Sequence, residues 1–243
     1  MSIPGAASPL FLATTGEAAA FEISRSLRFN APDSSYLSRQ PSSASNRKTW
    51  TWSAWVKRNT IGADQALFEA SPANGQYTLI WFNSSDQLVI PEDQGSGGVY
   101  FPNTLALFRD ASAWYHIVVA FDTTQATSTN RIKIYVNGVQ QALSNSYPSQ
   151  NHESYINSTN EHRIGNRVSD SEKLSASLAE VNFVDGSALD PTSFGAFDDN
   201  GVWQAIDTAG LTFGTNGFRL KFADNSSNAA PVSYTHLTLP TKA

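Results

Sequence analysis

Several aromatic side chains in this sequence stand among amides, hydroxyls and carboxylates, the combination that sugar binding requires. A flat ring packs against the C–H face of a sugar, while amide or acid groups bond its hydroxyls. Trp55 is the clearest case, because it lies alone among the polar residues of one strand face. Aromatic residues of a β protein also fill its core, and that alternative stays open. The predicted ligand-binding residues are Trp55, Trp81, Asn83, Asp86, Tyr100, Asn103 and Tyr147.

A glycan-cleaving site would need two carboxylates, which lie about 5 to 5.5 Å apart in retaining enzymes. The nearest arrangement on one predicted strand is Glu180, Asn182 and Asp185. Its middle member is an amide, and Asp185 falls at odd spacing beside Gly186, where a turn is expected. We therefore interpret Glu180 as a structural carboxylate at a sheet edge and predict no catalytic residue. Cleavage of glycans is the alternative.

The histidines give no pattern that indicates a metal site or an activated nucleophile. His116 lies inside a predicted strand, where a packed side chain is expected, and His152 and His162 are ten residues apart without zinc-ligand spacing. The sequence contains no nucleophile elbow, phosphate-binding loop or dinucleotide fingerprint. No metal site is predicted from these residues.

Strands must position these groups, and the stretch from Trp114 to Gln140 carries the strongest strand signals. Residues 115–121 are β-branched or aromatic on both faces, which predicts a strand covered on both sides. Residues 132–136 alternate apolar and polar and predict a strand with one apolar face. Asn137 and Gly138 follow at once and predict a tight type I′ hairpin, because both tolerate positive φ.

Other polar segments predict loops and turns between short strands. Residues 91–98, rich in glycine and in acid or amide groups, predict a mobile loop, and Ser144–Arg163 predicts a long polar loop. Asp190 followed by Pro191 predicts one short helix near residues 190–195. About ten short strands with almost no helical periodicity indicate an antiparallel sandwich.

The strand and hairpin motif resembles the concanavalin A-like lectin/glucanase superfamily, and within it the laminin-G-like jelly roll. The motif is Trp-x-His, an apolar run, a polar loop and then Ile-Tyr-Val-Asn-Gly. Ser53–Lys57 and Leu178–Leu189 are similar to two further motifs of this family, with Ala179 where the family often has Asp. The resemblance covers Leu27 to Leu189 and implies an all-β, antiparallel, two-sheet jelly-roll sandwich.

The resemblance implies one candidate cofactor, calcium, because some jelly-roll relatives bind this ion with oxygen atoms of their loops. Carboxylate, amide and carbonyl oxygens in loops are suitable ligands for this ion. Solvated turn residues explain the same side chains equally well. The candidate calcium ligands are Asp86, Asp93, Asp122 and Asn130.

The ends of the chain carry a narrower resemblance, to structural proteins of marine tailed phages. Residues 194–227 are similar to an extension behind the jelly roll of those proteins, and Ile23–Asn30 is similar to their opening. The predicted organisation is an N-terminal arm at 1–25, the jelly-roll domain at 26–205 and a C-terminal extension with one strand at 206–231.

Residues 232–243 break the pattern of the preceding sequence. Val232–Lys242 matches one reading frame of an adapter used in sequencing-library preparation. We expect that the native sequence stops at about Pro231 and that a metagenomic sequencing read ran into the adapter there, so the residues after it are excluded from fold reasoning. The alternative is a natural edge strand over Ser233–Leu239.

Composition narrows the classes of partner. The 243 residues carry a net charge of −5 and no long basic run, which argues against sequence-independent nucleic-acid binding. No apolar stretch approaches the roughly 20 residues that span a bilayer. The first 20 residues lack the positive start of a secretory signal peptide. There is no cysteine, so no disulfide framework exists.

These observations predict a non-catalytic jelly-roll module of a phage virion, in the tail or a tail fibre, or an extracellular protein. Its expected partners are host-surface glycans or other virion proteins, with a homo-oligomer as a further candidate. A glycoside hydrolase of the same fold and a structural virion domain without ligand are the alternatives.

Overall fold

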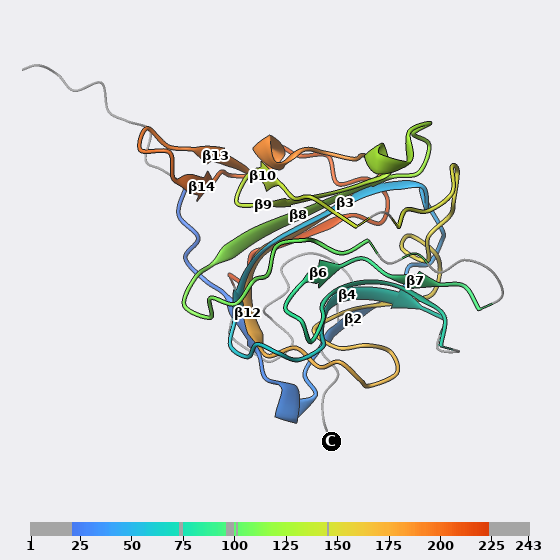
Figure 1. The fold of residues 1–243 in the computed structure, drawn as a ribbon, viewed down its shortest axis with the longest axis horizontal. Coiled ribbons are helices and arrows are strands. Elements are labelled where there is room, and N and C mark those ends of the chain that lie inside the picture. Colours follow the sequence, from blue (N-terminus) through green and yellow to red (C-terminus); the bar gives the residue numbers. More distant parts are fainter. Residues whose placement is uncertain (1–20, 73–74, 96–99, 101, 145, 224–243) are drawn as a thin grey trace, which may run out of the picture.

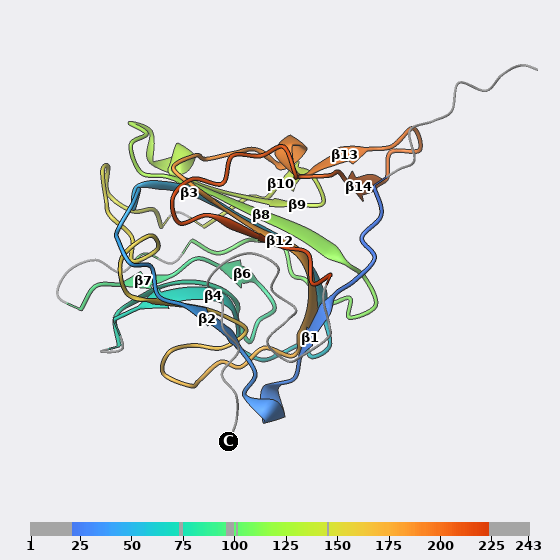
Figure 2. The same ribbon diagram turned by 180° about the vertical axis from the view of Figure 1, so that it is seen from behind.

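The computed structural model describes residues 21–72, 75–95, 100, 102–144 and 146–223, which form two antiparallel sheets packed face to face (Figures 1 and 2). The predicted fold class, an all-β antiparallel sandwich, is confirmed. The predicted N-terminal arm up to residue 20 and the adapter-like Val232–Lys242 lie outside the described residues. Within the described residues, no helix is long and apolar enough to cross a membrane.

The larger sheet has seven strands and contains both segments that the sequence marks most clearly. Its path runs β1–β12–β3–β8–β9–β10, and β15 pairs with β12 beyond the point where β12 bulges. In that order the strands are β1 (Leu27–Phe29), β12 (Ala176–Asp185), β3 (Thr49–Arg58), β8 (Tyr115–Asp122), β9 (Ile132–Val136), β10 (Val139–Gln140) and β15 (Phe218–Leu220).

The smaller sheet has six strands, with the path β2–β11–β4–β5–β6, and β7 pairs with β5. Its strands are β2 (Leu37–Arg39), β11 (Glu161–Ile164), β4 (Gln65–Ser71), β5 (Tyr77–Phe82), β6 (Leu88–Val89) and β7 (Glu92–Asp93).

A short hairpin lies on the outer face of the seven-stranded sheet, at one end (Figure 1). It consists of β13 (Gly195–Phe197) and β14 (Trp203–Ala205), which the sequence did not predict. The predicted helix near 190–195 is a single 3-10 turn, η3 (Pro191–Ser193), whose Thr192 amide donates to the Asp190 carboxylate. Two further 3-10 turns, η1 (Ala31–Asp33) and η2 (Ser128–Asn130), also lie among the described residues.

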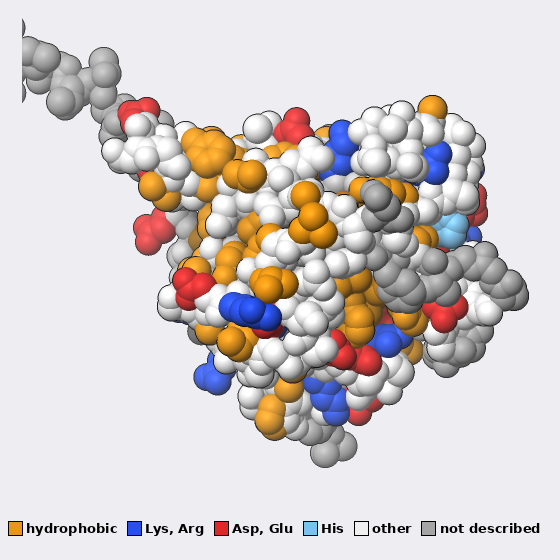
Figure 3. All heavy atoms as spheres, viewed as in Figure 1, with side chains coloured by type: hydrophobic (Ala, Val, Ile, Leu, Met, Phe, Trp, Pro, Cys, Tyr) orange, Lys and Arg blue, Asp and Glu red, His pale blue; other side chains and the backbone are white. Residues whose placement is uncertain are grey.

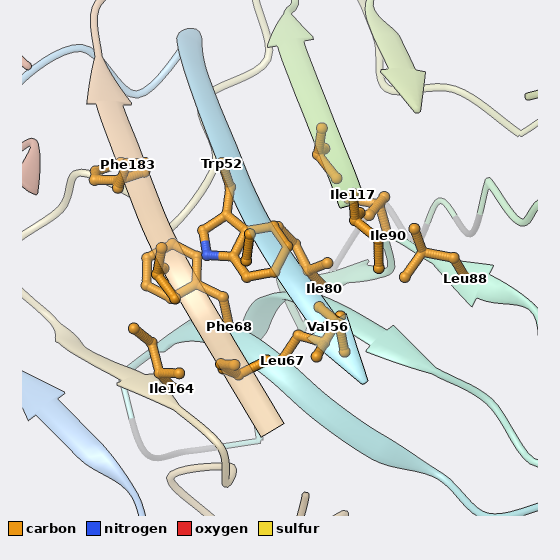
Figure 4. Packing of buried hydrophobic residues seen from close by; sticks show 14 of the residues in the cluster. Trp52, Val56, Leu67, Phe68, Ile80, Leu88, Ile90, Ile117, Ile164 and Phe183 are labelled. Carbon is orange, nitrogen blue, oxygen red and sulfur yellow. The ribbon is translucent and has the colours of Figure 1, made fainter. Parts of the chain in front are cut away.

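The main core fills the space between the two sheets. Figure 4 shows Trp52 of β3 packed among Phe183 of β12 and apolar side chains of β4 and β5. Trp50 stacks on Phe121 with ring centroids 4.6 Å apart. Both tryptophans are fully buried, as the alternation of β3 predicts.

The hairpin predicted at Asn137 and Gly138 is confirmed. Both residues have positive φ, 49° and 80°, and Val139 pairs with Val136 across the turn. β8 is buried on both faces, as predicted: Ile117, Val119 and Phe121 join the main core, while Val118 joins a second cluster on the outer face.

Two loop predictions were wrong in part. Residues 92–93 form β7, and the Glu92 carboxylate is fully buried, accepting hydrogen bonds from Thr78 (2.6 Å) and Tyr100 (2.8 Å) and lying 2.6 Å from His152 Nε2. A polar sequence therefore forms ordered structure here because its groups satisfy one another. The predicted loop Ser144–Arg163 ends early, because residues 161–163 belong to β11, which pairs with strands on both sides.

Candidate functional site

The candidate site begins at Trp55, on the outer face of β3. Side chains alternate along a strand, so Trp50 and Trp52 face the core while Ser53 and Trp55 face the opposite side. Ser53 is fully buried there, beneath a second layer of residues, whereas Trp55 is only half-buried. The outer face is therefore closed around Ser53 and partly open at Trp55.

Three aromatic rings are piled on this outer face, Trp203, His116 and Trp55, and we call them the aromatic stack. His116 of β8 is the cross-strand partner of Trp55 in the sheet register. Its ring lies 4.9 Å from that of Trp55 at 29°, and 5.9 Å from that of Trp203 at 23°. These are stacked arrangements within the range that stabilises aromatic pairs. Trp203 belongs to β14, so the β13–β14 hairpin covers the His116 side of the stack.

His116 is held in one orientation and one charge state. The Trp203 Nε1–H group donates to His116 Nδ1 at 2.9 Å, and His116 Nε2 lies 2.9 Å from Ser53 Oγ. Burial lowers the pKa of His116 to about 3, so the ring is neutral at physiological pH. Because Nδ1 accepts a hydrogen bond, the single ring proton is on Nε2 and is donated to Ser53.

This tautomer rules out a serine nucleophile activated by His116. A general base must take the serine proton with a free nitrogen lone pair, but Nε2 already carries its proton. Ser53 is also fully buried, so no substrate reaches its hydroxyl. The pair positions the stack, and its chemistry is structural.

The stack ends at a groove of about 600 Å³. It is lined by Trp55, Trp114 and Ala179 of the sheet and its approach, and by Gln204 and Ala205 at β14. The remaining lining residues form the segment Phe21–Ser26, which we call the strap. In Figures 1 and 2 the chain after residue 21 runs beside the β13–β14 hairpin, which places the strap and the hairpin next to each other.

The groove combines apolar rings with groups that can bond hydroxyls. Trp114 is 36% exposed, and the strap contributes the exposed side chains of Ser24, Arg25 and Ser26. Arg219 lies over the Phe21 ring at 5.7 Å and so supports the far end of the strap. A volume of this size with a few polar groups is typical of a small-molecule site.

The β13–β14 hairpin, which contributes Gln204 and Ala205 to the groove, also exposes two apolar side chains. Phe197 packs edge-on against Trp203 at 4.9 Å and is 54% exposed, and Val202 is 52% exposed. Figure 3 shows hydrophobic side chains at the surface of the end that carries β13 and β14. Exposed apolar patches of this kind often border interaction sites.

Glu180 is ion-paired, as expected of a structural carboxylate, but its predicted place at a sheet edge was wrong, because β12 pairs with β3 on one side and with β1 and β15 on the other. Glu180 lies at the bulge of β12 with φ of 45°, and its carboxylate accepts from Arg219 Nε at 2.8 Å. Asp185 is buried and accepts from the Asn157 side chain and the Asn216 amide, each at 2.9 Å. Asp185 is five positions after Glu180, roughly 16 Å along the strand, which exceeds the spacing of the two carboxyl groups in either class of hydrolase.

The seven predicted ligand residues do not come together in one place. Trp55 lies at the groove, whereas the other six belong to the six-stranded sheet or to segments beside it. Trp81 is half-buried in β5, and Tyr147 is half-buried against the main core. Tyr100 is buried, and burial together with Glu92 raises the pKa of its hydroxyl well above the ordinary value.

Asp86 and the two amides are engaged in holding turns. Asp86 is buried and pairs with Arg58 at 2.9 Å and Arg109 at 3.0 Å. Burial alone would raise the pKa of Asp86, but the Gly62 amide and these two guanidinium groups hold it below its usual value. The Asn83 side chain accepts from two amides of its own turn, and that of Asn103 bonds Ser144. A ligand role for these residues stays a prediction.

The calcium candidates are separated as well. Asp86 is engaged in its ion pairs, and Asp93 accepts from the Gly95 amide. Asp122 and Asn130 share a second hollow of about 240 Å³, but both Asp122 oxygens accept hydrogen bonds from Thr124 or Gln125. Across the described part of the chain, no three acidic or histidine side chains form a cluster that could hold a metal ion.

The sequence did not single out Trp114, Ala179, Gln204 or the strap as site residues. Trp114 opens the strongest strand motif, and Ala179 stands at the one position where a motif departs from the resembling family. The strap overlaps the opening segment that resembles phage proteins. None of these signals indicates that the segments meet, because they are far apart in the chain.

Comparison with known proteins supports the architecture. A family model described as the concanavalin A-like lectin/glucanases superfamily matches residues 32–193. No curated protein sequence matches the chain.

Solved structures with a similar fold are distant in sequence. A heptameric SAP-like pentraxin from Limulus polyphemus has a TM-score of 0.51 and 15% identity, over 70% of this chain and 80% of the pentraxin. The LG4–5 domains of mouse laminin α1 have a TM-score of 0.50 and 12% identity, over 84% of this chain but 48% of theirs. NanB with optactamide has a TM-score of 0.50 and 18% identity, over 71% of this chain and 28% of NanB. These likenesses concern the fold alone.

Proposed function

Because the chain belongs to the concanavalin A-like lectin/glucanase superfamily, we propose that it binds carbohydrate without cleaving it, in the groove beside Trp55. The observation that carries this proposal is the aromatic stack, whose outermost ring faces the groove. A sugar ring placed on Trp55 continues the pile by one layer.

The stack is suited to binding because its geometry is fixed before a ligand arrives. His116 is locked by Trp203 and Ser53, and it supports the Trp55 ring from behind. A binding surface that is already ordered loses little conformational entropy when the ligand arrives. Ser24, Ser26 and Gln204 are placed to bond sugar hydroxyls along the groove.

The charges at the groove support binding without cleavage. Among the described residues that line it, Glu22 is the single carboxylate, and it is exposed on the strap. Both retaining and inverting glycosidases require two carboxyl groups flanking the bond. Glu180, next to the lining residue Ala179, is bound to Arg219 and is unsuited to act as an acid or nucleophile.

We place this module on the virion of a tailed phage, in the tail or a tail fibre, where it adheres to host-surface glycans. The support is the likeness of the opening segment and of residues 194–227 to phage structural proteins. Assembly into a homo-oligomer or with other virion proteins would turn weak single-site binding into avidity. Detection of the chain by mass spectrometry in purified phage particles tests this setting.

A glycan array followed by calorimetry tests the binding function. The wild-type protein is expected to retain at least one glycan, and Trp55→Ala should weaken that binding by about tenfold or more. Trp81→Ala is the contrasting variant, because Trp81 is also a half-buried tryptophan and a predicted ligand residue but lies on the other sheet, away from the groove. It should bind like the wild type.

An assay for reducing ends on the same glycans separates the alternatives. Release of product that Glu180→Gln abolishes would identify a hydrolase and overturn the non-catalytic assignment. Silence on every glycan would favour a structural domain. Equal weakening by Trp55→Ala and Trp81→Ala would place the site elsewhere.

A further inference from the structure

Trp114 is an exposed aromatic residue that lines the groove together with Trp55. Its side chain is 36% exposed, and it forms no hydrogen bond and no ring or cation contact with any other described residue. The other five tryptophans of the chain are half-buried or buried. A single exposed apolar side chain is ordinary on a protein surface. A second tryptophan in the same groove is different, because both rings are available to one ligand.

The sheet register places these two tryptophans next to each other. Trp55 is the cross-strand partner of His116, and Val56 is the partner of Tyr115. Tyr115 packs against the main core, so His116 faces outward and Trp114, two positions before it, faces outward as well. Trp114 is therefore the diagonal neighbour of Trp55. Diagonal neighbours lie about 7 to 8 Å apart, within reach of aromatic side chains.

The two rings differ in how they are held. Trp55 is half-buried and stacks on His116 at 4.9 Å, so its ring is fixed by the layer behind it. Trp114 is not part of that stack and presents more of its surface to solvent. The groove has a volume of about 600 Å³, which is more than a single hexose fills. A ligand that fills the groove therefore extends past the Trp55 ring.

We propose that Trp114 forms a second sugar subsite beside Trp55, so that the groove binds two adjacent residues of a glycan chain in preference to a single sugar. The inference rests on the proposed glycan-binding function. One sugar packs its C–H face on Trp55 and the next residue packs on Trp114. Because the two sugars are already joined, the second contact adds affinity without a second loss of translational and rotational freedom.

Calorimetry with fragments of one glycan tests the second subsite. The probes are the glycan that the array retains best, each of its disaccharide units and each of its component monosaccharides. On the wild-type protein, the best disaccharide should bind about tenfold or more tightly than any of the monosaccharides. Trp114→Ala should abolish this gain and change monosaccharide affinity by less than about threefold, whereas Trp55→Ala should weaken both kinds of fragment. Trp114→Phe keeps an aromatic face and should retain most of the gain.

The outcomes separate the subsite from the function on which it rests. The subsite is overturned if wild-type protein binds disaccharide and monosaccharide equally, a result that needs no variant to fold. It is also overturned if Trp114→Ala, shown to be folded by its melting curve, keeps the gain or weakens both fragments alike. A Trp114→Phe variant as weak as Trp114→Ala would exclude ring stacking as the cause. If the wild type retains no glycan at all, the proposed function itself is wrong, and the inference is lost with it.

Discussion

The two faces of the seven-stranded sheet are both buried and both carry tryptophan, but they are built differently. On the inner face, Trp50 and Trp52 pack among aliphatic and phenyl side chains of the opposite sheet. On the outer face, Trp55 and Trp203 enclose a neutral histidine that has polar partners at both ring nitrogens. The tryptophans of the inner face are fully buried, whereas Trp55 on the outer face is half-buried and lines the groove.

The difference separates stability from recognition. Rings in a closed core gain their free energy from burial, and nothing can be added to them. The Trp55 ring is packed against His116 in the same way, but it is only half-buried and lines the groove. Strand β3 thus supplies the core tryptophans, Trp50 and Trp52, from one face and the groove tryptophan, Trp55, from the other, because successive side chains point to opposite faces.

The largest expected effect lies on the inner face. Trp52→Ala removes a fully buried indole and leaves a cavity, so the free energy of unfolding should fall by about 3 to 5 kcal/mol. Urea denaturation followed by circular dichroism measures it. Trp55→Ala should cost clearly less stability, because that ring is only half-buried.

For glycan affinity, the expected order is the reverse: Trp55→Ala should lose more than Trp52→Ala. Folded Trp52→Ala protein should bind like the wild type at a temperature well below its melting point, whereas Trp55→Ala should not. Equal losses of stability would show that the outer layer is as tightly packed as the core, and would break the contrast between the faces.

A middle-sized effect concerns the neutral histidine of the outer face. Its pKa is lowered by burial to about 3 in the folded state, against about 6.5 in the unfolded chain. As far as this group is concerned, the free energy of unfolding is at its full value above about pH 6.5. It falls by about 1.4 kcal/mol per pH unit as the pH drops from there toward 3, because the unfolded chain then binds a proton that the folded one does not. Between pH 7 and pH 5, where few carboxylates titrate, this amounts to about 2 kcal/mol.

His162 contributes in the same direction, because burial lowers its pKa to about 4. The variants His116→Gln and His162→Gln should each remove about half of the pH slope of the unfolding free energy in this range. A slope that stays unchanged in His116→Gln would mean that the ring is charged or accessible in the folded protein. The stack would then not be the rigid support inferred here.

Much of the fold could be predicted from local sequence. The parity of β3, the two-sided burial of β8 and the turn at Asn137 and Gly138 all follow from side-chain type and spacing. The pattern failed where polar residues were buried with partners from distant parts of the chain. β11 is an example, since its histidine and arginine lie in a strand paired on both sides.

The site was harder to predict than the fold for a related reason. Trp55 was recognisable, because a lone aromatic residue on a polar strand face is a local signal. The other groove residues come from segments that are far apart in sequence and meet only in the folded sheet and hairpin. They are the strap, Trp114, Ala179 and Gln204. Asp86 was expected at a ligand site because of its residue type. Its carboxylate instead forms ion pairs with Arg58 and Arg109, which are 28 and 23 residues away in sequence, so no local pattern indicated the pairing.

The smallest effect tests whether the hairpin layer really holds the stack. Gly138 has φ of +80°, and a Cβ atom there would lie 2.4 Å from the Trp203 ring. Gly186 has φ of +89° with nothing within 4 Å of such an atom. Alanine at either position should cost about 1 to 2 kcal/mol of unfolding free energy for the positive φ.

Only Gly138→Ala must also displace Trp203, and with it His116 and Trp55, so glycan affinity should drop by about threefold in that variant alone. If Gly138→Ala and Gly186→Ala bind glycan equally well, Trp203 does not position the stack, and Trp55 acts at the groove without support from the layer above it.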